Sequence, residues 1–173
     1  MAGDADNASM WDDADVFVSF DLEAADPADV DADFSGDWEL VGLLDGAAGF
    51  AQTTDEPRTT GRAWGAGVIK TNYKGAEVMV KFTALEDNDV TERLARPNLR
   101  EKVRIAFETR EGDKVRRRIA RKPATVRRAG DSTANEDNLA AIPLQADIFP
   151  DTAIDAADED QFWLVQSTED TGS

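Results

Sequence analysis

Alternation of apolar and polar residues is the feature that most constrains how this chain can fold. In the run KVRIAFETREGDKVRRRI, Val103, Ile105 and Phe107 alternate with charged or polar residues, and a turn at REGDK follows. Val115 and Ile119 then share one face of the return segment. Because the side chains of a strand point alternately to its two faces, this run predicts an antiparallel β-hairpin.

Several further runs of this kind are separated by turn residues. In EVMVKFT, Val80 and Phe82 lie on one face, and Trp38, Leu40 and Leu44 are expected to share a face of WELVGLL. Seven or eight short strands predict a mainly β fold, a β-sandwich or barrel. Besides the two strands of the hairpin, the expected strands are 16–20, 38–44, 63–73, 77–83, 138–149 and 161–166, and the segment 124–131 is expected to extend the hairpin ribbon.

One short flanking α-helix is expected after EVMVKFT, at about 89–96. Asp89 and Glu92 have the spacing of a capping box at its start. Pro97 ends the helical pattern, because proline cannot continue a helix. The junction from strand to helix is therefore predicted to be sharp.

Composition excludes several classes of site. The chain has no Cys and no His, so it lacks thiolate ligands and the commonest general base. Pairs of carboxylates are unspecific in a chain with 36 acidic residues. No apolar run is long enough to cross a bilayer, and no signal sequence follows Met1. We therefore expect no enzymatic activity, cofactor, metal or membrane contact. The chain is expected to be made in a cytoplasm.

Charge is large and uneven. The net charge is −17, with −15 on residues 1–60, +1 on 61–99, +8 on 100–128 and −11 on 129–173. Such acidity is typical of a soluble surface or of adaptation to high salt. Alternatively, opposite patches on identical copies attract each other.

Three adjacent arginines, Arg116, Arg117 and Arg118, lie in the basic segment. They are expected to pair with acidic surfaces of neighbouring copies. Nucleic-acid binding is the alternative, but no aromatic residue is interleaved for stacking, and the rest of the chain sums to −25. We therefore prefer ion pairs between or within chains.

The chain is expected to form one domain over 16–166, between two polar ends. Residues 1–15 are predicted to be a flexible acidic arm, with Met10 and Trp11 docking on another chain. Residues 167–173 form a polar tail. The side chains expected in the core are Trp38, Val80, Phe82, Ile105 and Phe107.

Five segments, in order, resemble the major tail tube proteins of long, non-contractile-tailed bacteriophages. They are GDWELVGLLDGAAGFAQTTDE, AWGAGVIKTN, KFTALEDN, VRIAFETREGDKVRR and NLAAIPLQADIFPD, and they cover about 36–150. The aromatic-rich run that often precedes GAGVIK in the family is reduced here to Trp64, and the acidic ends have no counterpart.

The resemblance implies the tail-tube fold, hexameric rings and rings stacked into a virion tail. Partners would be further copies of the chain and the tail terminator, distal tail and tape measure proteins. DNA would pass through the lumen without specific binding, which suits an acidic lining that repels phosphate.

The segment 45–62 is predicted to be a long loop between two strands. It has three Gly, one Pro and a single large apolar residue, Phe50. In a tube, this loop would contact the next ring through Phe50, Asp55, Glu56 and Arg58. Two other classes stay open: a monomeric β-sandwich that recognises a protein or sugar through this loop, and an enzyme that uses carboxylates.

Overall fold

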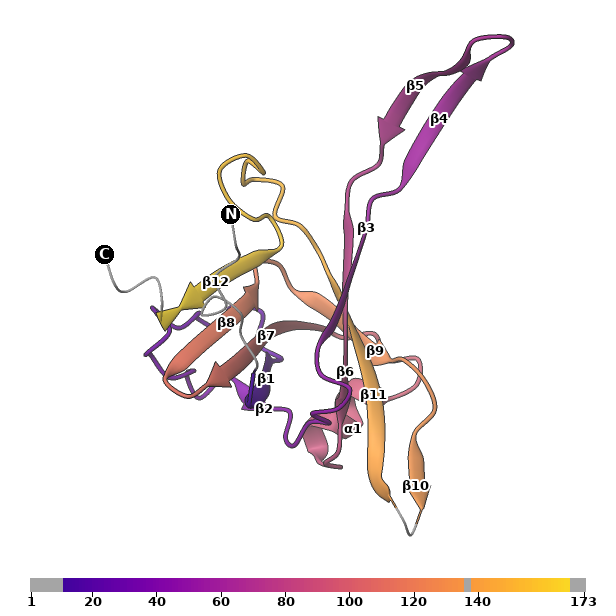
Figure 1. Ribbon diagram of the computed structural model, residues 1–173. Helices are drawn as coiled ribbons and strands as arrows, with labels where there is room; N and C mark the ends of the chain where they lie inside the picture. Colours follow the sequence, from indigo (N-terminus) through magenta and orange to yellow (C-terminus); the bar gives the residue numbers. More distant parts are fainter. Residues whose placement is uncertain (1–10, 136–137, 169–173) are drawn as a thin grey trace, which may run out of the picture.

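The computed structural model describes residues 11–135 and 138–168, and its architecture is mainly β with one short helix (Figure 1). This confirms the predicted fold class. The elements are β1 (Asp13–Ser19), β2 (Glu39–Leu40), β3 (Ala51–Asp55), β4 (Arg58–Ala63), β5 (Gly67–Tyr73), β6 (Glu77–Ala84), α1 (Asp89–Ala95), β7 (Lys102–Glu111), β8 (Lys114–Ala120), β9 (Ala124–Arg128), β10 (Thr133–Asn135), β11 (Asn138–Ile148) and β12 (Trp163–Ser167).

Strand β7 joins the two halves of one large antiparallel sheet. Its first two residues, Lys102 and Val103, pair with β9, which continues through β11 and β6 to β3. The rest of β7 pairs with β8 on one side and β1 on the other, and β12 and β2 extend these two neighbours. The predicted hairpin of β7 and β8 is confirmed, with a turn at Gly112, whose φ is 57°.

The main core lies between the two halves. Strand β6 buries every second residue, as its alternation predicts. Val80, Phe82, Ile105 and Phe107 are at most 2% exposed and belong to this core. Phe107 is in edge-to-face contact with Phe50, Phe82 and Trp163. Large aromatic rings at such angles add to the stabilisation from buried area.

A second, smaller core lies on the outer face of β7 and β8. Trp38 is 7% exposed and packs there with Ala106 and Ile119. The segment 21–37 had no predicted structure, yet it covers this face. Phe34 stacks on Phe17 with ring centroids 4.2 Å apart, and the Trp38 indole N–H donates to the Ala25 carbonyl.

Two strand predictions at the start of the domain need correction. Strand β1 begins at Asp13, not at residue 16, because Arg110 binds both Asp13 and Asp15 across the β1–β7 pair. Only Glu39 and Leu40 form a strand within 38–44. Leu40 is 47% exposed and Val41 is fully buried, so the predicted face was wrong.

The residue that caps the helix lies one position before the predicted one, Asp89. Asn88 is the N-cap: its side chain accepts the backbone N–H of Thr91, and the Thr91 hydroxyl accepts the N–H of Asn88. Asp89 and Glu92 stand in the first turn, where their charges suit the helix dipole. No described helix is long and apolar enough to cross a membrane.

The predicted loop 45–62 is mostly strand, which corrects that prediction. Strand β3 pairs with β6, and β4 pairs with β5 in a separate two-stranded ribbon. We call residues 57–74 the arm. Figure 1 shows the arm standing far out from the two halves of the sheet. At its base, the Lys74 N–H donates to the Pro57 carbonyl over 2.8 Å.

Candidate functional site

The tip of the arm is a tight turn built around glycine. The backbone N–H of Ala66 donates to the carbonyl of Ala63 over 3.2 Å. Gly65 and Gly67 have φ of 79° and 69°, values that a side chain would disfavour. This turn places Trp64 at the end of the arm, with its side chain fully exposed.

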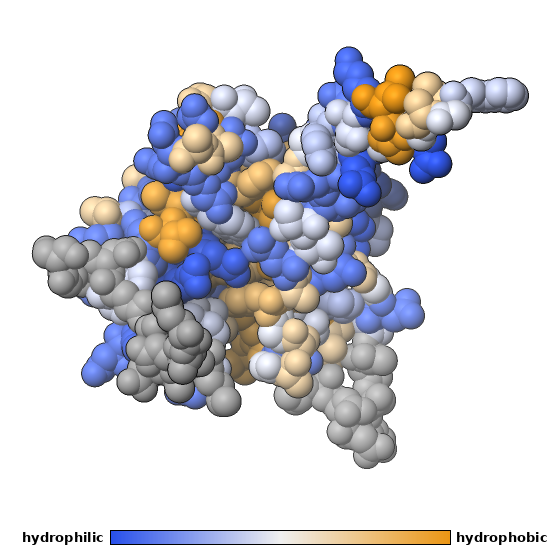
Figure 2. Space-filling view, turned by 45° about the horizontal axis from the view of Figure 1, so that its top comes forward, coloured by the Kyte–Doolittle hydropathy of each residue, from blue (hydrophilic) through white to orange (hydrophobic). Residues whose placement is uncertain are grey.

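Apolar side chains of the arm are exposed to solvent. Val68, Ile69 and Tyr73 are 50%, 66% and 63% exposed, and Figure 2 shows an apolar patch toward the outer end of the arm. An isolated two-stranded ribbon is only marginally stable in water. A ribbon that exposes large apolar groups in this way is typical of an interaction site.

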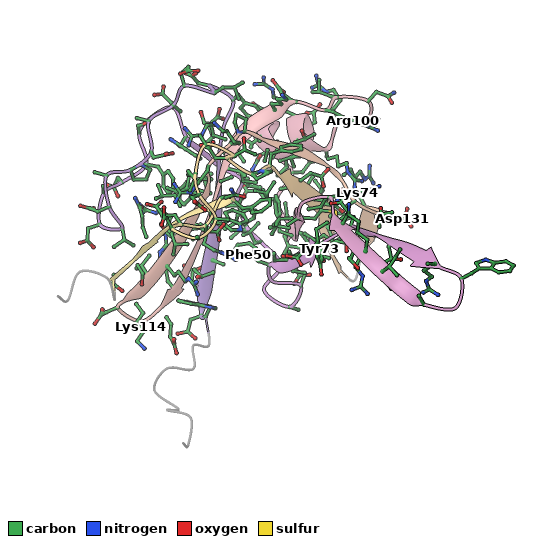
Figure 3. The ribbon with its side chains drawn as sticks, turned by 90° about the horizontal axis from the view of Figure 1, so that it is seen from above. Phe50, Tyr73, Lys74, Arg100, Lys114 and Asp131 are labelled. Carbon is green, nitrogen blue, oxygen red and sulfur yellow. The ribbon has the colours of Figure 1, made fainter. Side chains whose placement is uncertain are left out.

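The arm is also strongly basic. Residues 57–74 contain Arg58, Arg62, Lys70 and Lys74 and no acidic residue, which leaves −21 on the rest of the chain. Arg58 lies opposite Tyr73, where the ribbon begins, and Figure 3 shows Tyr73 and Lys74 at that end of the arm. The arm is therefore a cationic and aromatic projection from an acidic molecule.

The four residues predicted for ring contact fall in different places. Phe50 is half-buried, and its ring packs 5.0 Å from that of Phe107, so it belongs to the domain and not to the arm. Asp55 ends β3 opposite Glu77, and Glu56 follows it at the base of the arm. Only Arg58 lies within the arm.

A cavity of about 570 Å³ opens where β1 and the segment 40–50 face the β7–β8 hairpin. We call it the inter-sheet cavity. Phe50 lies on its wall, and Figure 3 shows this residue well away from the arm's outer end. Its apolar lining comes from Trp11, Leu40, Leu43, Leu44 and Phe50.

Charged groups line the same cavity. The Glu86 carboxylate accepts the N–H of Leu43, and the Asp45 carboxylate accepts that of Ala47. Arg118 donates to the side-chain oxygen of Gln52 over 2.8 Å. Burial, and then the nearby Arg116, lower the pKa of the Arg118 guanidinium. The cavity therefore offers apolar walls beside carboxylates and arginines.

The three adjacent arginines of β8 do not share one role. Arg116 is exposed and Arg118 half-buried, and both line the inter-sheet cavity. Arg117 lies on the opposite face and is 5% exposed, because it forms an ion pair with Glu108. This corrects the prediction for Arg117, since a buried side chain does not meet a neighbouring copy.

The predicted docking residues of the N-terminal arm are partly described. Met10 lies outside the described residues. Trp11 is 37% exposed and lines the inter-sheet cavity. Within 11–135 and 138–168, no group of three acidic residues is placed to hold a metal ion.

The alternation in the sequence did not reveal the arm or the inter-sheet cavity. The absence of acids between Glu56 and Glu77, next to a lone tryptophan near glycines, was the available signal for the arm.

A scan against protein-family models gives no match for this chain, and a search of curated proteins gives none.

Proposed function

We propose that this chain is a structural protein that assembles into stacked hexameric rings and forms the tail tube of a long-tailed bacteriophage. The proposal starts from the five ordered segments that resemble tail tube proteins. The mainly β fold with one flanking helix is consistent with it. In this role the chain is a component of a virion tail, and DNA passes through the tube.

The observation that carries the proposal is the arm. It exposes Trp64, Val68, Ile69 and Tyr73 on a ribbon that its own domain does not cover. Such a ribbon is stabilised when another surface buries those groups. Contact between different patches on identical copies is heterologous, and repetition of such contacts builds rings or filaments.

Charge is consistent with this assembly. The arm carries four basic residues, and the rest of the chain sums to −21. Attraction between the arm of one copy and the acidic surface of another favours association, whereas the acidic majority repels duplex DNA. The same charge distribution therefore serves both assembly and passage.

The test is electron microscopy of the purified chain with and without the arm. Because Pro57 and Lys74 are already hydrogen-bonded, Asn-Gly can replace residues 58–73 as a short turn. The replacement removes no residue of either core. We expect rings or tubes from the full chain, and folded subunits without tubes from the shortened chain.

Two outcomes would contradict the proposal. Monomers of the full chain at every concentration favour the alternative, a β-sandwich that binds another protein or a sugar through the arm. Long tubes from the shortened chain show that the arm is dispensable. Unfolding curves of both chains are the control, and we expect similar melting temperatures.

A further inference from the structure

We propose that the Trp64 tip of the arm docks in the inter-sheet cavity of a second copy of this chain. The inference rests on the proposed function in one respect, that copies of the chain associate. It adds which two surfaces meet and which residue is the anchor.

The inter-sheet cavity has the size and chemistry to hold an indole ring. Its volume of about 570 Å³ lies within the range of pockets that bind small ligands. Trp11, Leu43 and Phe50 offer apolar contact to the ring. The exposed Arg116 can stack on an indole face, and a carboxylate such as Glu86 can accept its N–H.

The occupant comes from another copy because the arm holds Trp64 away from its own cavity. Phe50 lines the cavity, and β3 and β4 then run outward to the tip. At about 3.3 Å per residue, this path spans on the order of 40 Å. Pairing of β3 with β6 and of β4 with β5 keeps the path extended.

Charge complementarity favours a second copy over other partners. The arm contains no acidic residue and four basic residues, Arg58, Arg62, Lys70 and Lys74. The inter-sheet cavity presents Asp45 and Glu86, whose carboxylates accept only backbone N–H groups in the described part of the chain. A cationic arm that approaches this mouth gains attraction without breaking an ion pair.

The geometry of this contact is open-ended. The tip and the cavity are different surfaces, so each copy can donate its tip to one neighbour and accept the tip of another. Such a heterologous contact propagates, as stacking of rings requires. Trp64 and the cavity are thus predicted to form the anchor of each repeated interface.

The absence of cysteine allows a direct test by disulfide crosslinking in the proposed tube. Ala66 lies beside Trp64, and Leu43 lines the cavity and is 71% exposed. Mild oxidation of the double variant Ala66→Cys with Leu43→Cys should give a ladder of crosslinked chains. The matched control joins Ala66→Cys with Val165→Cys, an exposed position on β12 outside the cavity, and should give no ladder.

A second measurement keeps the test independent of cysteine chemistry. Trp64→Ala should weaken association about tenfold or more, as loss of an anchor residue does, and leave the melting temperature unchanged. Leu43→Asp should weaken association similarly, whereas Val165→Asp should not. Unaltered association of Trp64→Ala would overturn the inference.

Failure of this inference and failure of the proposed function are distinguishable. Tubes without the Ala66–Leu43 crosslink would overturn docking in the cavity and leave the tube proposal standing. A crosslinked ladder without rings or tubes would support docking and contradict the tube. A change in the fluorescence of Trp64 on addition of duplex DNA, with no Ala66–Leu43 crosslink, would assign the tip to nucleic acid. That result would overturn the inference.

Discussion

Arg117 donates from Nε to Oε2 of Glu108 over 2.7 Å, and the two side chains are only 6% and 5% exposed. The same guanidinium donates to the carbonyls of Asp29 and Ala32. The Cζ atom of Arg117 also lies over the Phe34 ring, 4.5 Å from the ring centroid. The pair therefore fixes the segment that covers the outer face of β7 and β8.

Reversing the charge of Arg117 is predicted to lower the free energy of unfolding of the chain strongly. Arg117→Glu would bury a second carboxylate beside Glu108, and breaking a buried ion pair costs about 3–5 kcal/mol. Arg116→Glu makes the same charge change at an exposed site and should shift stability by less than about 0.5 kcal/mol. Urea unfolding of both variants measures the difference. Equal midpoints would contradict the structural role of Arg117.

Asn88, the N-cap of α1, is predicted to contribute more to stability than Asp89 in the first turn. Asn88 accepts the N–H of Thr91 and donates to the Val41 carbonyl, both over 2.9 Å. Asn88→Ala should therefore cost about 1–2 kcal/mol. Asp89→Ala loses only a favourable dipole interaction, about 0.3–1 kcal/mol. Thermal unfolding of the two variants ranks them, and the reverse order would refute this assignment.

Gly42 is predicted to be the least replaceable glycine near the inter-sheet cavity. Its φ is 106°, and an added Cβ would lie 2.6 Å from Oε2 of Glu86 and 2.9 Å from Nδ2 of Asn88. Gly42→Ala should cost about 1–3 kcal/mol because of backbone strain.

Gly46→Ala is the matched control for this change. An added Cβ at Gly46 meets no atom within 4 Å, so its effect should stay within about 0.5 kcal/mol. Denaturant unfolding distinguishes the two variants. A stable Gly42→Ala protein would show that the cavity wall rearranges at little cost.

Duplex DNA is predicted to bind assembled tubes only weakly. Each copy carries −17, so the proposed hexameric ring would carry −102. Long-range repulsion of this kind opposes association with phosphate at ordinary salt. Fluorescence anisotropy with labelled duplex measures the affinity. Submicromolar binding at physiological salt would overturn the proposed passage of DNA through a repelling lumen. Loss of that DNA binding in the variant Arg58→Ala would place the contact on the arm.

The alternation of apolar residues was sufficient to predict the strands that bury one face in the main core. Val80 and Phe82 on β6, and Ile105 and Phe107 on β7, are buried on the face that the pattern indicates. Strand β5 lies within the expected strand 63–73, whereas β4 was missed because it is polar and exposed, so no buried face imposes an alternation. Strand signals of that kind are indistinguishable from those of a loop.

Long-range contacts account for the other differences. Arg117 and Glu108 lie in a segment whose charges suggested an exposed basic ribbon. The segment 21–38 folds over them, and no local pattern encodes that coverage. The cavity has the same origin, because Trp11, Leu43 and Arg118 meet only through the pairing of β1 and β8 with β7.

The position of β7 and β8 at the centre of their half of the sheet has a consequence for synthesis of the chain. Strand β1 can pair with β2 early, but it must wait for residues 104–110 before it can pair with β7, and β8 acquires its outer neighbour only with residues 163–167. Such distant pairings close slowly, because loop entropy is lost before contacts form. A nascent chain would therefore keep the β7-facing edge of β1 unpaired until most of the protein has left the ribosome. In the proposed assembly, premature capture of an incomplete copy would thereby be discouraged, since the walls of its inter-sheet cavity come together late.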